Sequence, residues 1–390
     1  MVTAPLAPPQ PPYPQQQPLP PPPRSPGPAK VGLLVPLSGP NAELGQAILN
    51  AAQLALFEAG GDHLTLIPRD TGGTSDGAAN AARAALADGA GLILGPLLAA
   101  EVRAVKPIAA DAHLNVIAFS TVTDLAGGNT FLMGFLPKEE VVREVGFARE
   151  RGLGHFAALA PNSPYGHLMA DALRQAASAT GASVTSIEFY DPSGADAGAA
   201  IRRLLPGSAA SGDAVSAAPD PDLSPAPMPM PAFDALLLPE GGAQLGQIAR
   251  QLKAAGLDTK AVHLLGSGLW DVPDIGSEPV LDGGWFAASP PDARRDFERR
   301  YRATYGRDPP RLASLGYDAA ALAGALAHGQ GGPPFSRAAI LSPKGFTGVD
   351  GLFRFTPDGL VERGLAVLEV EPEGNVVVSP APQSFENPGY

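Results

Sequence analysis

The chain has 390 residues, of which 45% are hydrophobic and 17% charged, so it is long enough to bury the cores of two domains. A formal net charge of −12 argues against nucleic acid as a partner, because affinity for a phosphate backbone comes largely from clustered lysine and arginine. The absence of cysteine excludes disulfides, thiolate metal sites and cysteine nucleophiles.

Residues 1–29 are rich in proline and are predicted to form an extended, disordered tether, because proline lacks the amide donor and fixes φ. Such a tether either spaces a folded domain from an anchor or has no role of its own. The chain contains no apolar run long enough for a transmembrane helix, and Met1 is followed at once by proline-rich sequence. We therefore expect no export signal within this chain.

From Lys30 onward, short apolar runs alternate with patterns of helical spacing. The predicted strands of this first series are 31–35, 64–68, 91–94, 116–119 and 131–134, and the predicted helices are 41–58, 76–88 and 100–112. Strands that alternate with helices of this length predict a parallel sheet with right-handed crossovers and helices on both faces.

A second series of the same kind begins near Glu139. Its predicted strands are 155–160, 184–190, 233–238 and 262–265, and its predicted helices are 139–151, 166–180, 195–205 and 243–255. Residues 206–231 interrupt the series with proline, alanine and serine. We interpret this stretch as a solvent-exposed insertion rather than a lid, because it has no aromatic residue and only three charged ones, all aspartates, whereas a lid would use such residues. The chain is therefore predicted to form two doubly wound α/β lobes.

The patterns that accompany catalysis are missing. Gly266-Ser267-Gly268 is the closest match to a hydrolase elbow and lacks its spacing. The six histidines form no metal-binding motif, and neither a phosphate-binding loop nor a dinucleotide fingerprint occurs. We predict that the protein is not an enzyme and uses no cofactor or metal.

The turns that follow the predicted strands are rich in glycine and hydroxyl groups, which suits ligand binding at the carboxyl edge of an open sheet. They are Ser38 to Pro40, Gly95 to Leu97, Ser120 to Thr123, Asn162 to Gly166, Glu240 to Gly242 and Ser267 to Gly268. From Lys30 to about Pro380 they resemble, in this order, the Leu/Ile/Val-binding type of the periplasmic binding protein type I superfamily. The segments that carry the resemblance best are 31–40, 93–97, 163–166 and 313–325.

The resemblance implies two parallel-sheet lobes joined by a hinge of three crossings. Lobe 1 would comprise residues 30–136 and 289–335, and lobe 2 residues 137–288 and 336–380, with 381–390 as a tail. In relatives that bind amino acids, a serine, a threonine and backbone amides hold the ligand carboxylate, an aromatic packs on the ligand and an acid holds its ammonium group. The ligand-binding positions that correspond or stand nearby are Ser38, Leu97, Ala99, Ser120, Thr121, Thr123, Tyr165, Glu240 and Ser267.

The sequence departs from that pattern at two points. No serine stands at the turn of Leu98 and Ala99, and no carboxylate stands at Ser267, where Glu240 or Asp271 would have to substitute. The resemblance implies a periplasmic, transport-associated solute-binding protein that holds an amino acid or a related small ligand between its lobes and delivers it to an ABC-transporter permease.

A second hypothesis also fits the sequence. The proline-rich tether and the sequence Pro68 to Thr74 followed by Gly95-Pro96-Leu97 also resemble the penicillin-binding-protein activators. These are outer-membrane lipoproteins that regulate peptidoglycan synthesis by contacting a peptidoglycan synthase. Under this hypothesis the cleft would be vestigial and the partner would be a protein.

Overall fold

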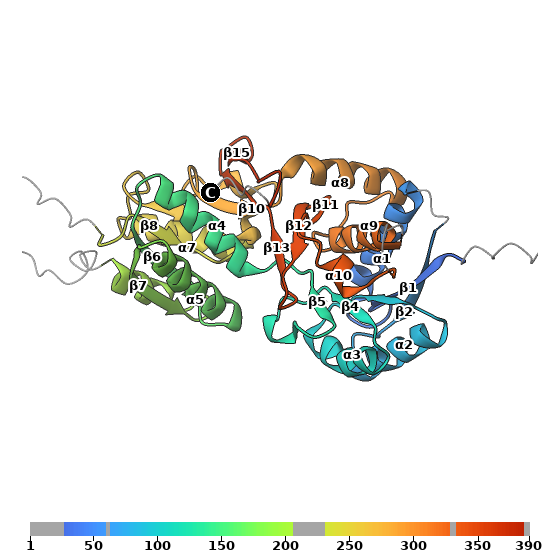
Figure 1. The fold of residues 1–390 in the computed structure, drawn as a ribbon. Helices are drawn as coiled ribbons and strands as arrows, with labels where there is room; N and C mark the ends of the chain where they lie inside the picture. Colours follow the sequence, from blue (N-terminus) through green and yellow to red (C-terminus); the bar gives the residue numbers. More distant parts are fainter. Residues whose placement is uncertain (1–26, 60–62, 206–230, 328–332, 386–390) are drawn as a thin grey trace, which may run out of the picture.

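The computed structural model describes residues 27–59, 63–205, 231–327 and 333–385, which form two α/β lobes side by side (Figure 1). Most of the predicted tether, nearly all of the predicted insertion 206–231 and the second half of the predicted tail lie outside the described residues. The four described ranges supply the strands and helices of both lobes.

Lobe 1 is built on a parallel five-stranded sheet in the order β2-β1-β3-β4-β5. Its strands are β1 (Ala29–Val35), β2 (Leu64–Asp70), β3 (Leu92–Leu94), β4 (Asn115–Ala118) and β5 (Thr130–Leu132). Helices α1 (Ala42–Glu58) and α9 (Ala313–Ala327) cover one face, and α2 (Ser75–Ala87) and α3 (Ala99–Asp111) the other. The helix α8 (Pro291–Tyr305) packs on α1, and the short α10 (Arg337–Ile340) completes the lobe.

Lobe 2 is built on a seven-stranded sheet in the order β15-β14-β10-β9-β8-β6-β7. Its strands are β6 (His155–Pro161), β7 (Ser183–Tyr190), β8 (Ala235–Leu237), β9 (His263–Leu265), β10 (Trp285–Ala288), β14 (Ala366–Glu369) and β15 (Val376–Ser379). The first five run parallel, whereas β14 and β15 are antiparallel additions at one edge. Helices α4 (Pro137–Glu150) and α5 (Pro164–Ala179) cover one face, and α6 (Ala197–Leu204) and α7 (Gly242–Ala254) the other. The predicted α/β fold with two parallel-sheet lobes is confirmed.

Both lobes use glycine in the first turn of a helix to bring the helix close to the strand before it. A Cβ atom on Gly45 in α1 would lie 1.8 Å from the carbonyl oxygen of Pro36, and one on Gly166 in α5 would lie 1.9 Å from that of Pro161. Neither position tolerates a side chain without a shift of the backbone. These two contacts fix how the helices leave the carboxyl edge of each sheet.

Within the described residues, the chain passes between the lobes three times, at residues 133–136, 289–290 and 364–365. The last crossing lies later than predicted, which corrects the assignment of residues 336–380 to lobe 2. Strands β11 (Phe346–Gly348), β12 (Gly351–Phe355) and β13 (Val361–Arg363) form a separate antiparallel sheet. Phe353, Phe355 and Val361 from this sheet are buried in the core of lobe 1, so within residues 336–380 only β14 and β15 belong to the sheet of lobe 2. Figure 1 shows β11 and β12 beside α9 of lobe 1.

Candidate functional site

A cavity of about 240 Å³ lies where the two lobes and the three crossings meet. Phe135, Ser289 and Leu365 each come from a different crossing. The remaining wall residues are Thr121, Pro137, Glu140, Tyr165, Gly268, Leu269, Asp271, Ala288, Arg311 and Leu312. The cavity is thus an inter-lobe cleft of the kind that the sequence predicts.

Lobe 1 contributes a cation to this cavity. Arg311 precedes α9, and its guanidinium carbon lies 4.0 Å from the centroid of the Phe135 ring. Its Nη1 lies 2.9 Å from Oδ1 of Asp350, a side chain that is fully buried. Asp350 therefore holds Arg311 in place and neutralises part of its charge, while Thr121 adds a hydroxyl to the same lobe's wall.

Lobe 2 contributes a carboxyl group and a phenol. Glu140 lies on α4, and its Oε2 accepts a hydrogen bond of 2.9 Å from the backbone amide of Gly268. Burial raises the pKa of Glu140 to about 7. Tyr165 is the second residue of α5 and is hydrogen-bonded to the side chain of Ser267. Burial, followed by the neighbouring charge of Glu140, raises the pKa of Tyr165, so its hydroxyl keeps its proton at neutral pH.

Asp271 also lines the cavity, but its charge is already balanced. Arg294 Nη2 lies 2.8 Å from Oδ1 of Asp271, and Arg294 Nη1 contacts Oδ2. Arg311 Nε lies 3.9 Å from the same carboxylate. Among the described residues, Glu140 is in contrast a cavity carboxyl without a basic side chain within ion-pair distance. The cavity thus presents one partly neutralised arginine on lobe 1 and one unpaired carboxyl on lobe 2.

The structure brings several of the predicted site residues together at this cavity. Thr121 and Tyr165 lie on its wall. Ser120 is buried beside Thr121, and its Oγ accepts a hydrogen bond of 3.2 Å from the amide of Val122. Ser267 is fully buried behind Tyr165, and its Oγ accepts from the amide of Leu269 at 3.3 Å.

The other predicted positions do not line the cavity. Ser38 is exposed in a turn, where its amide donates to Asp70. Leu97 belongs to the core of lobe 1, Ala99 is the first residue of α3, and Thr123 is exposed. Glu240 accepts a hydrogen bond of 2.7 Å from the Tyr190 hydroxyl, so its carboxylate serves a contact within lobe 2.

Sequence reasoning missed Glu140 and Arg311. Glu140 stands just beyond the first crossing, and Arg311 stands just before α9. Neither residue belongs to a recognisable motif. The one available signal is Glu139-Glu140, which follows Pro137 and Lys138 at the start of a helix after the first crossing. Their side chains line one cavity only because the crossings fold two distant segments against one another.

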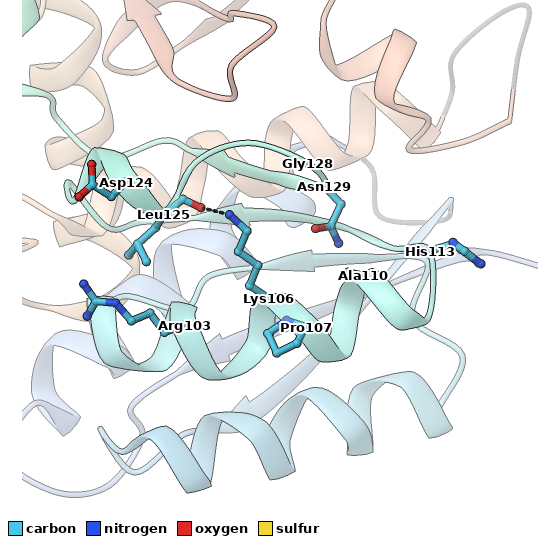
Figure 2. A pocket seen from close by; sticks show the side chains of 9 residues that line it. All are labelled: Arg103, Lys106, Pro107, Ala110, His113, Asp124, Leu125, Gly128 and Asn129. Atoms are coloured by element: carbon cyan, nitrogen blue, oxygen red, sulfur yellow. Dashed lines mark hydrogen bonds between the residues drawn. The ribbon is translucent and has the colours of Figure 1, made fainter.

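A second hollow, of about 630 Å³, lies on the outside of lobe 1 between α3 and residues 124–129 (Figure 2). The Nζ of Lys106 donates hydrogen bonds to the carbonyl oxygens of Leu125 at 2.9 Å and Ala126 at 3.1 Å. Arg103 and Asp124 lie at one end and His113 at the other (Figure 2). Because Lys106 is used to hold the loop against the helix, this hollow is a weaker candidate for ligand binding than the cleft.

The described ranges contain neither a candidate metal site nor a candidate membrane-spanning helix. No group of three or more histidine, aspartate or glutamate side chains is arranged to hold a metal ion there. In the same ranges, no helix is long and apolar enough to cross a membrane.

Known proteins are similar to this chain over most of its length. A family model described as periplasmic binding protein matches residues 28–375. No curated protein sequence matches the chain significantly. Among solved structures, a putative branched-chain amino acid ABC transporter protein from Rhodospirillum rubrum is 21% identical and has a TM-score of 0.74, covering 90% of this chain and 100% of that chain.

Two other solved structures have bound ligands. The branched-chain amino acid transporter substrate-binding protein LivJ from Streptococcus pneumoniae, in complex with isoleucine, is 19% identical with a TM-score of 0.60, covering 90% of this chain and 100% of that chain. A solute-binding protein of an ABC transporter from R. palustris, in complex with benzoate, is 18% identical with a TM-score of 0.61. The match covers 92% of this chain and 98% of that chain. At such identities the likeness establishes the fold. Taken with the family match over most of its length, it shows that the chain belongs to the periplasmic binding protein family, a family of solute-binding proteins that are not enzymes.

Proposed function

We propose that this protein binds an amino acid or a related small zwitterion in the inter-lobe cavity and delivers it to an ABC-transporter permease. The observation that carries the proposal is the unpaired carboxyl of Glu140 facing a cavity that Arg311 bounds on the other lobe. A ligand with an amino group and a carboxylate can complement both walls at once. A neutral ligand would leave Glu140 buried without a partner.

The dimensions of the cavity agree with a ligand of this class. Its volume of about 240 Å³ is below the roughly 300–1,000 Å³ of pockets for drug-sized molecules. Phe135, Leu312 and Leu365 supply an apolar surface for a short side chain, and Thr121 and Tyr165 supply hydroxyls. We place Thr121 and Tyr165 in contact with the ligand, with Ser120 and Ser267 supporting them from behind.

The two relatives with bound ligands represent two classes of small molecule. One binds isoleucine, which has an amino group and a carboxylate, and the other binds benzoate, which has a carboxylate alone. Glu140 favours the first class here, because the carboxylate of a ligand such as benzoate would repel an ionised Glu140 and supply no positive charge to balance it. The ammonium group would instead stabilise the ionised form of Glu140.

Isothermal titration calorimetry against amino acids, their decarboxylated amines and benzoate tests the proposal. We expect at least one amino acid to bind the wild type, and Glu140→Gln to weaken that binding at least tenfold at pH 8. Glu139→Gln is the matched control, because Glu139 is the neighbouring carboxyl and does not line the cavity. A panel without any binding, or equal affinity for wild type and Glu140→Gln, would contradict the proposal.

The alternative prediction, an activator of a peptidoglycan synthase, gains no support from the family match or from the relatives named above. Most of the proline-rich tether, which together with residues 68–74 and 95–97 suggested it, lies outside the described residues. We propose a periplasmic location, with attachment to the outer membrane as a lipoprotein as the variant that the alternative would require. Affinity capture from an envelope extract that recovers a synthase and no permease would reverse this preference.

A further inference from the structure

Asp271 of lobe 2 forms ion pairs with two arginines of lobe 1, neither of which belongs to a crossing: a close one with Arg294, and a longer one of 3.9 Å with Nε of Arg311. Asp271 directly follows Trp270, which is buried in the core of lobe 2. Arg294 lies on α8, whose Phe297 and Tyr301 pack against α1 in lobe 1. The Arg294–Asp271 pair therefore connects a turn of lobe 2 to a helix of lobe 1.

The pair has the geometry of a strong contact. Both guanidinium nitrogens Nη1 and Nη2 of Arg294 meet the two carboxylate oxygens of Asp271, in a bidentate arrangement. The side chain of Asp271 is 5% exposed and that of Arg294 is 14% exposed. Such shielded, bidentate pairs are stronger and more directional than pairs on an open surface.

The other arginines of α8 behave differently. Arg295 pairs with Asp292 and Arg299 with Asp296 on the same helix. Arg300 pairs with Glu58 of α1, within lobe 1. Of the described ion pairs of α8, only the Arg294–Asp271 pair reaches lobe 2.

The pair also borders the candidate site. Asp271 lines the inter-lobe cavity together with Gly268 and Leu269 of the same turn. Arg294 lies outside that cavity, in a groove of about 760 Å³ on the far side of Asp271. Asp271 and Arg311 line both spaces, so they separate the cavity from the groove.

We propose that Arg294 is a positioning residue that holds residues 268–271 of lobe 2 against lobe 1, and so controls how far the lobes separate. The crossings allow the lobes to move about a hinge, and the ion pair opposes that movement on one side of the cavity. Arg294 would then affect the cavity through Asp271 without touching a ligand. This inference goes beyond the proposed function, because it concerns lobe separation in the absence of any ligand.

Distance measurements between spin labels test the proposal on the unliganded protein. The chain has no cysteine, so Ala87→Cys in α2 and Ser178→Cys in α5 place one label on an exposed site of each lobe. In double electron–electron resonance we expect Arg294→Gln to add a population at longer distance than in the labelled parent. Asp271→Asn should shift the distribution at least as far, because it also loses the 3.9 Å contact with Arg311, and the double variant should shift no further than Asp271→Asn alone.

Arg295→Gln is the matched control, because it removes the same charge from the adjacent residue and should leave the distance distribution unchanged. Arg294→Lys keeps the charge but loses the bidentate contact, and we expect a smaller long-distance population. If Arg294→Gln does not fold, the Arg294→Lys variant alone is compared with the labelled parent. Distributions that are the same in the parent, Arg294→Gln and Arg294→Lys would overturn the proposal. Since no ligand enters the measurement, failure to find a ligand would leave this result standing.

Discussion

Lobe 1 and lobe 2 have the same layered architecture but opposite charges where they face the cavity. Lobe 1 presents the arginines Arg311 and, behind Asp271, Arg294. Lobe 2 presents the carboxyl groups of Glu140 and Asp271. The difference shows that a repeated fold supplies two similar walls, and that single residues beside the crossings give each wall its chemistry.

The two charge types also respond differently to burial. An arginine keeps its charge in almost any environment, whereas a carboxyl group can take up a proton. On the lobe 1 side, charge is balanced by buried acids: Arg311 pairs with Asp350, and Asp350 and Asp318 lie close to Arg363. On the lobe 2 side, Glu140 accepts a hydrogen bond from the amide of Gly268 and is attracted by Arg311, but it forms no ion pair among the described residues. Substitutions of the buried charged residues, first in lobe 1 and then in lobe 2, therefore test this difference.

The largest effect is expected from Arg363→Met. Arg363 is 4% exposed, and its Nη2 donates a hydrogen bond of 2.7 Å to the carbonyl oxygen of Met133. Without its charge, Asp318 and Asp350 would face each other in the core of lobe 1 with Arg311 as the remaining cation. Removing one partner from a buried ionic cluster costs about 3–5 kcal/mol, and we expect a loss of this size in the free energy of unfolding measured with urea.

The matched control adds Asp318→Asn to Arg363→Met. Burial, followed by repulsion from Asp350, raises the pKa of Asp318, so a neutral amide there should recover part of the loss. If Arg363→Met alone costs less than about 1 kcal/mol, the acids of this cluster do not depend on Arg363.

The second prediction concerns the pH dependence that Glu140 imposes on lobe 2. Its pKa is about 7 in the folded protein and 4.5 as the reference value, so the folded state holds the proton more tightly. Folding stability must then fall as the pH rises through the window from 4.5 to 7, and the full penalty applies above it. A shift of this size corresponds to up to about 3 kcal/mol.

Glu140→Gln should remove this share of the pH dependence. We expect the variant to be more stable than the wild type at pH 8 and equally stable at pH 4, as measured by urea unfolding at both values. The amide can still accept the hydrogen bond from Gly268, so the packing is preserved. A variant that is no more stable than the wild type at pH 8 would show that Glu140 is better solvated than its burial indicates.

The sequence was sufficient for the fold, and for part of the site. Alternating apolar runs and helical spacing predicted the five strands of the lobe 1 sheet and four of the seven strands of the lobe 2 sheet, because those patterns are local, whereas β10, β14 and β15 were not predicted as strands. Strands β11–β13 were assigned to the wrong lobe, since the position of Phe353 and Phe355 depends on contacts with distant residues of lobe 1. Tyr165 and Thr121 were found through their turns, whereas Glu140 and Arg311 have no local motif and gain their meaning only when the crossings bring them to one cavity.

A smaller effect is expected from Gly166→Ala, which tests the close helix–strand contact that both lobes share. The added Cβ atom would lie 1.9 Å from the carbonyl oxygen of Pro161, so α5 must shift and carry Tyr165 with it. Overpacking of this kind typically costs about 1–3 kcal/mol of folding stability. Gly146→Ala in α4 is the control, because nothing lies within 4 Å of its Cβ position, and it should stabilise the protein by up to about 1 kcal/mol.

The smallest effect is expected from removing one phenolic hydroxyl in each lobe. Tyr165→Phe loses the hydrogen bond to Ser267 in lobe 2, and Tyr305→Phe loses a bond of 2.8 Å to the carbonyl oxygen of Asn50 in lobe 1. Each should cost about 1 kcal/mol in unfolding experiments. Only Tyr165 lines the cavity, so only Tyr165→Phe should also weaken ligand binding in calorimetry. Equal affinities for the two variants would mean that the Tyr165 hydroxyl supports the wall of lobe 2 and does not contact the ligand.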